Sequence, residues 1–163
     1  MSRAYVVMGV SGCGKSTVAE MFADRAGLSW LDGDSLHGEA NVAKMSRGEA
    51  LTDADRWPWL DRVGEALGRE ADVVACSALR RVYRERIAAA ADGRVTFLFL
   101  DGSRTVLEER VNNRPGHFMP PALLDSQLAT LERPGPDEDA IRVDIDRSRA
   151  EIVEAFVSAL GLE

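Results

Sequence analysis

The chain has 163 residues, of which 45% are hydrophobic and 29% charged, so it suits one globular domain, spanning residues 1–163, and leaves no room for a second. A formal net charge of −7 argues against nucleic acid or an anionic membrane as a partner, because both attract basic surfaces. Two cysteines are too few for a disulfide framework or a cysteine metal cage. No apolar run approaches membrane-spanning length and the first one begins close to Met1, so we expect a soluble cytoplasmic protein without a signal peptide.

A phosphate-binding motif follows the first apolar run, Ala4 to Met8. Residues 9–16 read Gly-Val-Ser-Gly-Cys-Gly-Lys-Ser and match G-x-x-x-x-G-K-[ST] at every fixed position. In such a loop the glycines let backbone N–H groups turn towards phosphates, the lysine reaches the β and γ oxygens, and the serine hydroxyl ligates Mg²⁺. The helical pattern of residues 16–26 adds the positive end of a helix. A chance glycine-rich turn is the alternative, but strand, loop and helix occur in the required order.

The motif predicts nucleotide binding and assigns roles to its residues. We expect Lys15 to be catalytic and Ser16 to ligate the metal. The predicted nucleotide-binding set in this loop is Gly9, Val10, Ser11, Gly12, Cys13, Gly14, Lys15, Ser16 and Thr17.

Short apolar runs at residues 4–8, 28–31, 73–76, 95–100 and 141–145 predict buried strands. Helical patterns separate these runs, which predicts an α/β fold with a parallel sheet. Helix ends are marked by Gly27, by the capping boxes Thr52/Asp55 and Ser148/Glu151, and by Pro120-Pro121 before a helix that runs towards Leu131.

Two stretches break the simple alternation of strands and helices. Residues 35–71 carry more helix than one crossover needs, and residues 114–136 are rich in proline and glycine. Because insertions of this kind commonly carry function, we expect a helical substrate-binding insertion at 35–71 and a lid at 114–136.

Paired carboxylates, Asp32 and Asp34, follow the second predicted strand with Gly33 between them. Ligands bind at the carboxyl ends of strands in open α/β sheets, so one acid can help to hold Mg²⁺ while the other accepts a hydroxyl proton. An ordinary Asx turn is the competing interpretation. The preceding phosphate-binding loop favours the functional one.

Residues 51–56 read Leu-Thr-Asp-Ala-Asp-Arg and predict a helix start whose acids suit the helix dipole. Arg56 opposes that dipole, so an anionic ligand is the better explanation for it. The following Trp57-Pro58-Trp59-Leu60 is expected to pack in the core and not to stack on a base.

Arginines cluster after the third strand, in the segment from Cys76 to Arg84. Arg80 and Arg84 share a helix face, and such like charges repel unless an anion lies between them, although a solvated face explains any single arginine equally well. A further arginine, Arg114, precedes Pro115-Gly116-His117-Phe118 and suits a lid that neutralises phosphoryl charge. A packed loop histidine is the alternative for His117.

The run from Val95 to Asp101 superficially resembles a Walker B strand, an apolar strand that ends in a metal-binding acid. We do not assign it that role, because Asp101-Gly102-Ser103 is explained as a turn and helix cap and the acid beside Mg²⁺ can come from the second strand. No N-K-x-D guanine-reading segment occurs in the chain, which favours ATP over GTP.

Taken together, these residues resemble the gluconokinase family, and the resemblance runs in order through nearly the whole chain. It is carried by Met8 to Ser16, Leu31 to Asp34, Leu36-His37, Asn41, Lys44-Met45, Gly48, Leu51 to Asp53, Asp55-Arg56, Pro58 to Leu60, Cys76 to Leu79, Tyr83-Arg84, Gly116 to Phe118 and Val143 to Asp146. The chain departs from the family pattern mildly, at Cys13, Gly38 and Arg80, where Ser, Pro and Lys are more usual.

The resemblance implies a three-layer fold like that of nucleoside monophosphate kinases, with a five-stranded parallel sheet, a lid, and ATP and Mg²⁺ as cofactors. It implies phosphorylation of D-gluconate at its 6-hydroxyl. Lys15, Asp34 and Arg114 would be catalytic, and Ser16 and Asp32 would serve the metal. Arg110 and Arg114 would close over ATP, whose adenine would lie near residues 146–148. The substrate-binding set would be Asp34, His37, Lys44, Arg56, Ser77, Arg84 and His117.

Two other functions stay open. Shikimate kinase, or another small-acid kinase of the same fold, would share the phosphate-binding loop and paired aspartates. A non-catalytic regulator that binds ATP as a switch is the alternative of another class, and it would show no ATP turnover dependent on a small acceptor. The oligomeric state is not determined by the sequence, and a homodimer is one assembly it allows.

Overall fold

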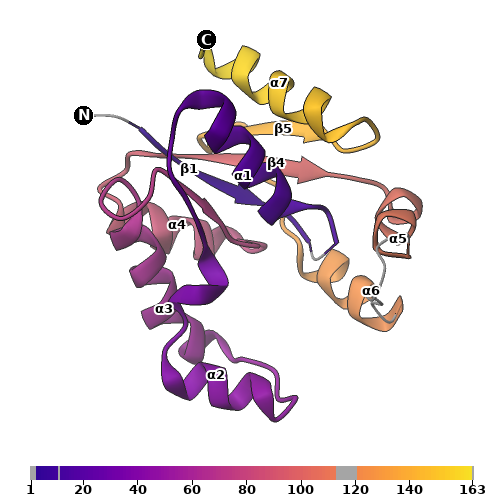
Figure 1. Ribbon diagram of the computed structural model, residues 1–163. Coiled ribbons are helices and arrows are strands. Elements are labelled where there is room, and N and C mark those ends of the chain that lie inside the picture. The colour runs from indigo at the N-terminus through magenta and orange to yellow at the C-terminus, as the bar shows by residue number, and fades with distance from the viewer. Residues whose placement is uncertain (1–2, 11, 113–120, 163) are drawn as a thin grey trace.

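The computed structural model describes residues 3–10, 12–112 and 121–162 (Figure 1). Within these ranges β1 (Ala4–Met8), β2 (Trp30–Asp32), β3 (Val73–Ala75), β4 (Val95–Asp101) and β5 (Ala140–Asp144) form one sheet of five strands in the order β2-β3-β1-β4-β5. Every pair of neighbouring strands is parallel. The predicted parallel α/β sheet is therefore confirmed, with β2 starting two residues later than its apolar run.

Helices cover both faces of the sheet and extend beyond its carboxyl edge. The helical elements are α1 (Lys15–Ala26), the 3₁₀ turn η1 (Gly33–Leu36), α2 (Glu39–Ser46), α3 (Asp53–Ala66), α4 (Arg81–Ala90), α5 (Arg104–Asn112), α6 (Pro121–Thr130) and α7 (Arg149–Leu160). Figure 1 shows α1 and α7 on one face, α3 and α4 on the other, and α5 and α6 beyond the carboxyl end of β4. This is the three-layer arrangement that the resemblance implied.

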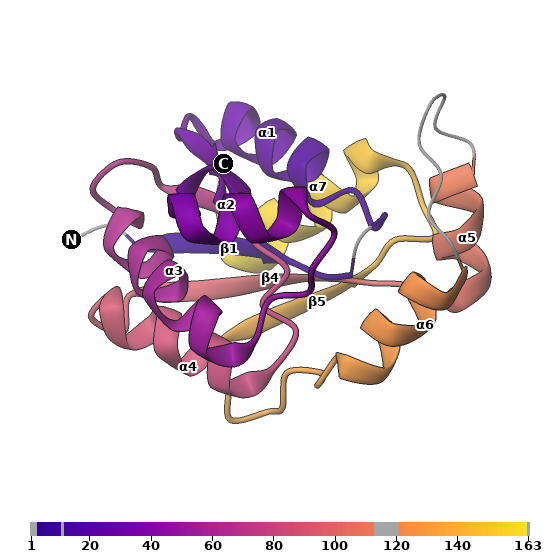
Figure 2. The same ribbon diagram turned by 90° about the horizontal axis from the view of Figure 1, so that it is seen from below.

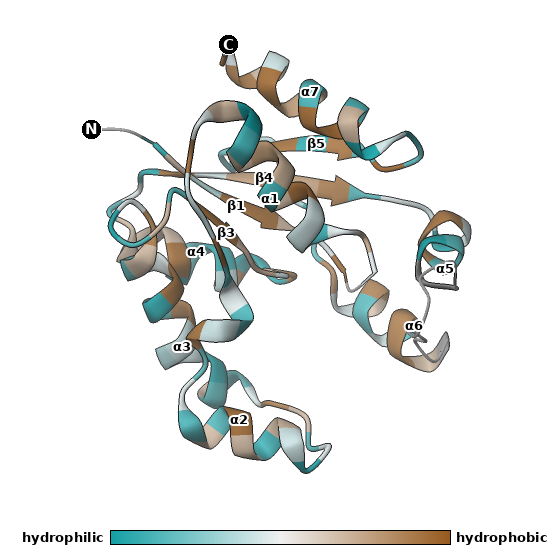
Figure 3. Cartoon of the chain, viewed as in Figure 1, coloured by the Kyte–Doolittle hydropathy of each residue, from teal (hydrophilic) through white to brown (hydrophobic). Residues whose placement is uncertain are grey.

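The central strand explains why the layers form. All five residues of β1 are buried, and they alternate between two apolar clusters. Tyr5 and Val7 pack with α1 and α7, whereas Ala4, Val6 and Met8 pack with α3 and α4. A strand covered on both faces needs an unbroken apolar run, which is the pattern that predicted it. Figure 3 shows the same distribution, with hydrophobic strands inside and hydrophilic residues on the outer helix surfaces.

The predicted helix ends are observed where the structure describes them. Thr52 and Asp55 form a reciprocal capping box, as do Ser148 and Glu151. Gly27 ends α1 with a φ of 72°, a left-handed conformation that glycine adopts without steric cost. Pro121 is the first residue of α6, whereas Pro120 lies outside the described residues.

The segment between β2 and β3 contains η1, α2 and α3, which accounts for its extra helical pattern. Figure 2 views the molecule from the side on which α2 projects away from the sheet. No helix in the described part of the chain combines the length and apolar character needed to cross a membrane.

Helices α3 and α4 approach each other closely at Gly64. A Cβ atom on Gly64 would lie 2.5 Å from both the Ala90 Cβ and the Ile87 carbonyl oxygen. Such distances require the two helices to separate, and the second atom belongs to a backbone that cannot rotate away. Glycine at this position therefore sets the spacing of the layer that carries residues 53–56.

Replacing Gly64 with alanine should lower the free energy of unfolding by ~1–2 kcal/mol, because an overpacking cost of ~2–3 kcal/mol, expected for contacts this short, outweighs the ~1 kcal/mol that alanine normally contributes inside a helix. Urea unfolding followed by circular dichroism measures the change. Glu65→Ala, on the exposed side of the same helix, is the matched control and should change stability by less than about 0.5 kcal/mol. A Gly64→Ala protein as stable as the wild type would contradict this account of the helix spacing.

Candidate active site

A cavity of about 250 Å³ lies at the carboxyl ends of the neighbouring strands β1, β3 and β2. Its walls come from three separate segments that parallel pairing brings to one edge of the sheet. The lining residues are Gly12, Gly14, Lys15, Ser16, Thr17, Asp32, Asp34, Ala75, Cys76 and Ser77. The phosphate-binding loop and the paired aspartates, which sequence reasoning treated as separate motifs, therefore share one cavity.

The loop between β1 and α1 has the backbone that its glycines predict. Gly12 and Gly14 have φ values of 88° and 93°, where residues with a side chain are strained. A Cβ atom on Gly9 would lie 2.8 Å from the Cys13 Sγ atom and 3.0 Å from the Leu100 carbonyl oxygen. The first turn of α1 has no side-chain cap, so its N–H groups stay available to an anion.

Two polar side chains of this loop lie at the cavity. The Lys15 Nζ atom donates a hydrogen bond to the Val10 carbonyl oxygen at 3.2 Å, and the Ser16 Oγ atom donates to the Asp32 Oδ2 atom at 3.4 Å. Thr17 also lines the cavity. Ser11, predicted to bind nucleotide, lies outside the described residues.

The paired aspartates serve both the turn and the cavity. The Asp32 Oδ1 atom accepts a hydrogen bond from the Asp34 backbone N–H at 3.0 Å, as an Asx turn would. Both carboxylates nevertheless line the cavity, and Asp34 is exposed to it. Gly33 is needed between them because a Cβ atom there would lie 2.5 Å from the Ala75 carbonyl oxygen. The two interpretations of this segment are thus compatible.

Mg²⁺ fits this donor set. No group of three or more histidine, cysteine or acidic residues suited to a metal occurs in the part of the chain that the structure describes. Mg²⁺ is typically bound through one or two protein oxygen ligands, substrate phosphates and water, and not by an all-protein cage. The Ser16 hydroxyl and the Asp32 carboxylate, already in contact, supply oxygen donors of that kind.

Trp59 supports the aspartate turn from below. This side chain is 7% exposed and its Nε1 atom donates to the Gly33 carbonyl oxygen at 2.8 Å, while its ring stacks on His37 at a centroid distance of 4.2 Å. Burial lowers the pKa of His37, although the charge of Asp34 acts in the opposite direction. The expectation that Trp59 packs in the core is confirmed. No pattern in the sequence predicted its hydrogen bond to the turn, because Gly33 is 26 residues away.

The predicted substrate cations of the insertion are held by nearby acids. Lys44 forms an ion pair with Asp55 at 2.7 Å, and this hydrogen bond is the largest cause that lowers the pKa of Asp55 to about 2. Arg80, which lies outside the insertion at the start of α4 and is not in the predicted substrate-binding set, pairs with Asp53 at 2.6 Å. Arg56 makes longer contacts, 3.6 Å to the Asp53 carboxylate and 3.4 Å to the Tyr83 hydroxyl. The structure therefore engages Arg56 the least tightly of these cations.

The predicted substrate role of Arg84 is contradicted by its position. Its side chain is 1% exposed and faces the interior, where the Nε atom donates to the Glu138 carboxylate at 2.7 Å. Arg80, the other member of the predicted pair, binds Asp53 instead. No anion is needed between the two arginines because each is neutralised by a separate carboxylate of the chain. The partner of Arg84 is 54 residues away, which is why spacing could not identify it.

The lid predictions are covered only in part. The Arg110 Nη2 atom donates to the carbonyl oxygens of Ile145 and Arg147, at 2.5 Å and 2.6 Å, so this arginine supports the turn after β5. Arg114 and His117 lie outside the described residues.

Asp101 is not the turn residue that the sequence suggested. It is the last residue of β4, is buried, and accepts from Arg142 at 2.5 Å and from Arg133 at 3.2 Å. Ser103 does cap α5, since its Oγ atom accepts from the Val106 N–H at 3.3 Å. Both carboxylate oxygens of Asp101 accept hydrogen bonds from arginines of the chain, and Asp101 is not among the residues that line the cavity.

Both cysteines are buried with free thiols, Cys13 in the loop and Cys76 at the end of β3. Burial raises the pKa of both, that of Cys76 to about 12. These thiols therefore stay protonated near neutral pH and are poor nucleophiles.

Comparisons with known proteins agree with this geometry. A family model described as an AAA domain matches residues 5–134. A gluconokinase from Gluconobacter oxydans (strain 621H) is 47% identical over 160 residues, which is 95% of this chain and 89% of that protein. The crystal structure of a gluconokinase from Sinorhizobium meliloti 1021 superposes with a TM-score of 0.89 at 49% identity, covering 98% of this chain and 91% of that one.

The similarity to shikimate kinase is limited to the fold. The structure of shikimate kinase from Bacteroides thetaiotaomicron has a TM-score of 0.69 but 18% identity, which shows a common fold and no more. The matches to gluconokinases, by contrast, extend over nearly the whole chain at more than twice that identity. The chain belongs to the gluconokinase family, among the phosphate-binding-loop proteins that the AAA domain model describes.

Proposed function

We propose that the protein transfers the γ-phosphoryl group of ATP to the 6-hydroxyl of D-gluconate, giving 6-phospho-D-gluconate and ADP. The observation that carries this proposal is the shared cavity, in which Lys15 and Ser16 of the phosphate-binding loop face Asp34 of η1. One side of the cavity suits a triphosphate and the other offers a carboxylate to an acceptor hydroxyl. The gluconokinase relatives support gluconate as that acceptor.

On the nucleotide side, the loop N–H groups and Lys15 would bind the phosphates. Lys15 would exchange its hydrogen bond to the Val10 carbonyl for β and γ oxygens. Ser16 would ligate Mg²⁺, and Asp32 would hold water in the metal's coordination shell. When bound, Mg²⁺ neutralises charge on the phosphates during transfer.

On the acceptor side, Asp34 would orient the 6-hydroxyl and accept its proton. The transition state of phosphoryl transfer is loose, so position and charge stabilisation matter more than base strength. The Asp34 carboxylate is held over the cavity by its own backbone contact with Asp32 and by Trp59 beneath Gly33. That support suits a residue whose main task is alignment.

The remaining binding residues follow from the resemblance and their place in the fold. His37, Lys44, Arg56 and Ser77 would contact gluconate from the insertion at 35–71 and from the end of β3. Arg110 would act through the turn at residues 145–147, and Arg114 and His117 would belong to a lid at 114–136. We expect the enzyme to act in the cytoplasm, in keeping with its buried free thiols.

A coupled ADP-release assay with several acceptors tests the substrate. Gluconate should support turnover, whereas shikimate, other sugar acids and nucleoside monophosphates should support far less. Turnover with shikimate in preference to gluconate would replace the proposal by the rival kinase. A protein that binds ATP but releases no ADP with any of these acceptors would favour an ATP-binding regulator.

Lys15→Ala should abolish phosphoryl transfer while leaving the fold intact, because the side chain lies at the cavity and contributes little to the apolar core. Circular dichroism and the ADP-release assay measure the two properties separately. Arg47→Ala is the control, since it removes a cation from an exposed ion pair with Glu49 and should retain activity. A Lys15→Ala enzyme with near-normal turnover would move the active site elsewhere.

Asp34→Asn should lower kcat by about 10²–10⁴-fold with a smaller change in ATP affinity, because the amide cannot accept the hydroxyl proton. Asp32→Asn should chiefly raise the Mg²⁺ concentration needed for half-maximal rate, because its carboxylate contacts Ser16. Titration of Mg²⁺ at saturating gluconate distinguishes the variants. Rescue of Asp34→Asn but not of Asp32→Asn by excess Mg²⁺ would reverse the two roles.

Arg56→Ala should raise the KM for gluconate by about 10- to 100-fold, the loss expected for one charge-assisted hydrogen bond, with little change in the KM for ATP. Initial rates with each substrate varied in turn provide both constants. Arg86→Ala is the control, because Arg86 lies on α4 and pairs with Asp61. Equal effects on both KM values would place Arg56 beside the nucleotide.

A further inference from the structure

The turn that follows β3 contains a strained residue. Ala78 has a φ of 46°, a left-handed conformation that residues with a side chain rarely adopt, and it is 1% exposed. Strain of this kind persists only where surrounding contacts force it, and it tends to occur at functional sites. The contacts that hold Ala78 therefore show what the turn is built to do.

On one side, the turn contacts the phosphate-binding loop. The Ser77 carbonyl oxygen accepts a hydrogen bond from the Gly9 N–H at 3.2 Å. Ser77 also lines the cavity beside Lys15 and Ser16. The conformation of Ala78 sets the direction of the chain immediately after Ser77, so it affects both the cavity wall and the support of the loop.

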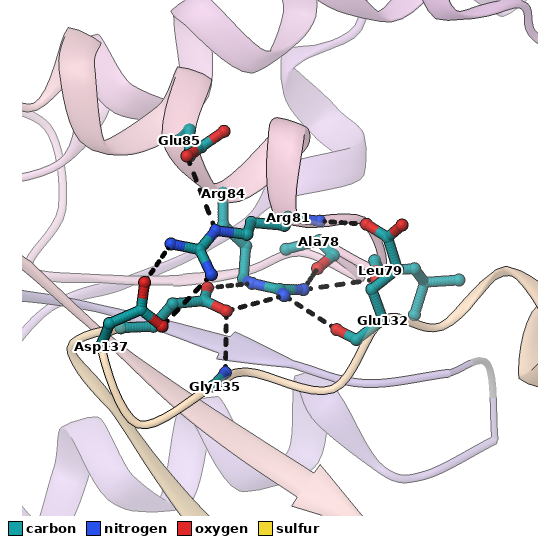
Figure 4. Close-up of polar contacts among 9 residues, drawn as sticks. Ala78, Leu79, Arg81, Arg84, Glu85, Glu132, Gly135 and Asp137 are labelled. Atoms are coloured by element: carbon teal, nitrogen blue, oxygen red, sulfur yellow. Dashed lines mark hydrogen bonds and ion pairs between the residues drawn. The ribbon is translucent and has the colours of Figure 1, made fainter.

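On the other side, Arg84 holds the turn from within the protein. Its Nη1 atom donates to the Ala78 carbonyl oxygen at 2.8 Å and to the Leu79 carbonyl oxygen at 3.3 Å. Its Nη2 atom donates to the Glu132 carbonyl oxygen at 2.8 Å, and Nε and Nη2 together bind the Glu138 carboxylate. All five N–H donors of the guanidinium are used, as Figure 4 shows.

The segment that Arg84 reaches follows α6 and has contacts of its own with the turn. The Glu132 N–H donates to the Leu79 carbonyl oxygen at 2.7 Å, and its carboxylate accepts from the Arg81 N–H at 2.8 Å. Glu138 also accepts from the Gly135 N–H at 2.9 Å. Residues 132–138 are thus joined to the turn after β3 through one buried side chain and its neighbours (Figure 4).

We propose that Arg84 is a positioning residue for phosphoryl transfer: by binding the Ala78 and Leu79 carbonyls it keeps Ala78 left-handed, holds Ser77 against the phosphate-binding loop, and ties that turn to residues 132–138. The inference rests on the proposed function, because its readout is gluconate phosphorylation. A planar fork is required for this task, since one group must reach three carbonyls and a carboxylate at once.

A purely stabilising role is the alternative, because a buried ion pair that loses one partner destabilises a protein. Two variants separate the roles. Arg84→Lys keeps the charge beside Glu138 but loses the fork, and we expect kcat to fall about 10- to 100-fold through misplacement of the site. Both KM values should change by less than about threefold, since Arg84 contacts neither substrate.

Glu138→Gln is the matched control. It removes the charge from the far side of the guanidinium and leaves the contacts with Ala78 and Leu79 in place. We expect a lower melting temperature with kcat near that of the wild type. Assays are run at a temperature where circular dichroism shows every variant fully folded.

Recovery of kcat by a second substitution distinguishes positioning from stability, because a change in stability alone would not restore kcat. Ala78→Gly, added to Arg84→Lys, lets the turn take its positive φ without a steric penalty and should recover most of the lost kcat. If Arg84→Lys does not fold, the double variant Arg84→Met/Glu138→Leu replaces the pair with apolar groups of similar size, which commonly preserves folding. Its kcat should fall as described for Arg84→Lys, again with rescue by Ala78→Gly.

The outcomes distinguish the inference from the proposed function. A wild-type enzyme inactive with gluconate would overturn the proposed function. An active wild type with unchanged kcat in the folded Arg84 variant would overturn the inference alone. A loss of kcat that Ala78→Gly does not recover, or an equal loss in Glu138→Gln, would also overturn it, because either result would trace the effect to stability or charge and not to the turn.

Discussion

The parallel pairing of β1 with β3 and β4 is the constraint on which the rest of the structure depends. Val7 pairs with Ala75 and Met8 pairs with Phe99, so these three strands end at one edge of the sheet. The phosphate-binding loop, the turn after β3 and the aspartates after β2 are therefore neighbours, although more than 60 residues separate Lys15 from Ser77. A shift of register would move the loop away from the acids that face it, and no side chain in the cavity could correct that.

Close backbone approach is the second requirement of this edge. Gly9 lies against the end of β4 and Gly33 against the end of β3, each where a Cβ atom would meet a carbonyl oxygen within 3.0 Å. Without a side chain at these glycines, the backbones of the loop and of the aspartate turn can pack directly against the strand ends. Trp59, from the opposite layer, then fixes the aspartate turn by binding the Gly33 carbonyl. The cavity is thus shaped by backbone packing as much as by the side chains that line it.

Charge has two distinct uses in this acidic chain. At the cavity, Lys15 and Asp34 line the wall, and they are the charged residues that the proposed function assigns to the phosphates and to the acceptor hydroxyl. Elsewhere, arginines such as Arg84, Arg110 and Arg142 bind carbonyls or carboxylates of the chain itself and hold turns in place. Arg84 is the most buried of these, since 1% of its side chain is exposed, whereas that of Arg142 is 58% exposed and Arg110 is partly exposed. The N–H donors of an arginine can therefore hold the backbone of a site in place as well as bind its ligand.

The sequence by itself determined the parallel α/β fold, the phosphate-binding loop, the helix caps and the paired aspartates, because each depends on local periodicity or on residues a few positions apart. Tertiary structure alone decided which charges pair. It turned Arg84 inward to Glu138, gave Arg80 to Asp53, and placed two arginines on Asp101. These choices depend on partners that are distant in sequence, and an arginine has the same local pattern whether it faces a substrate, solvent or a buried carboxylate. Only the packing of the layers distinguishes those environments.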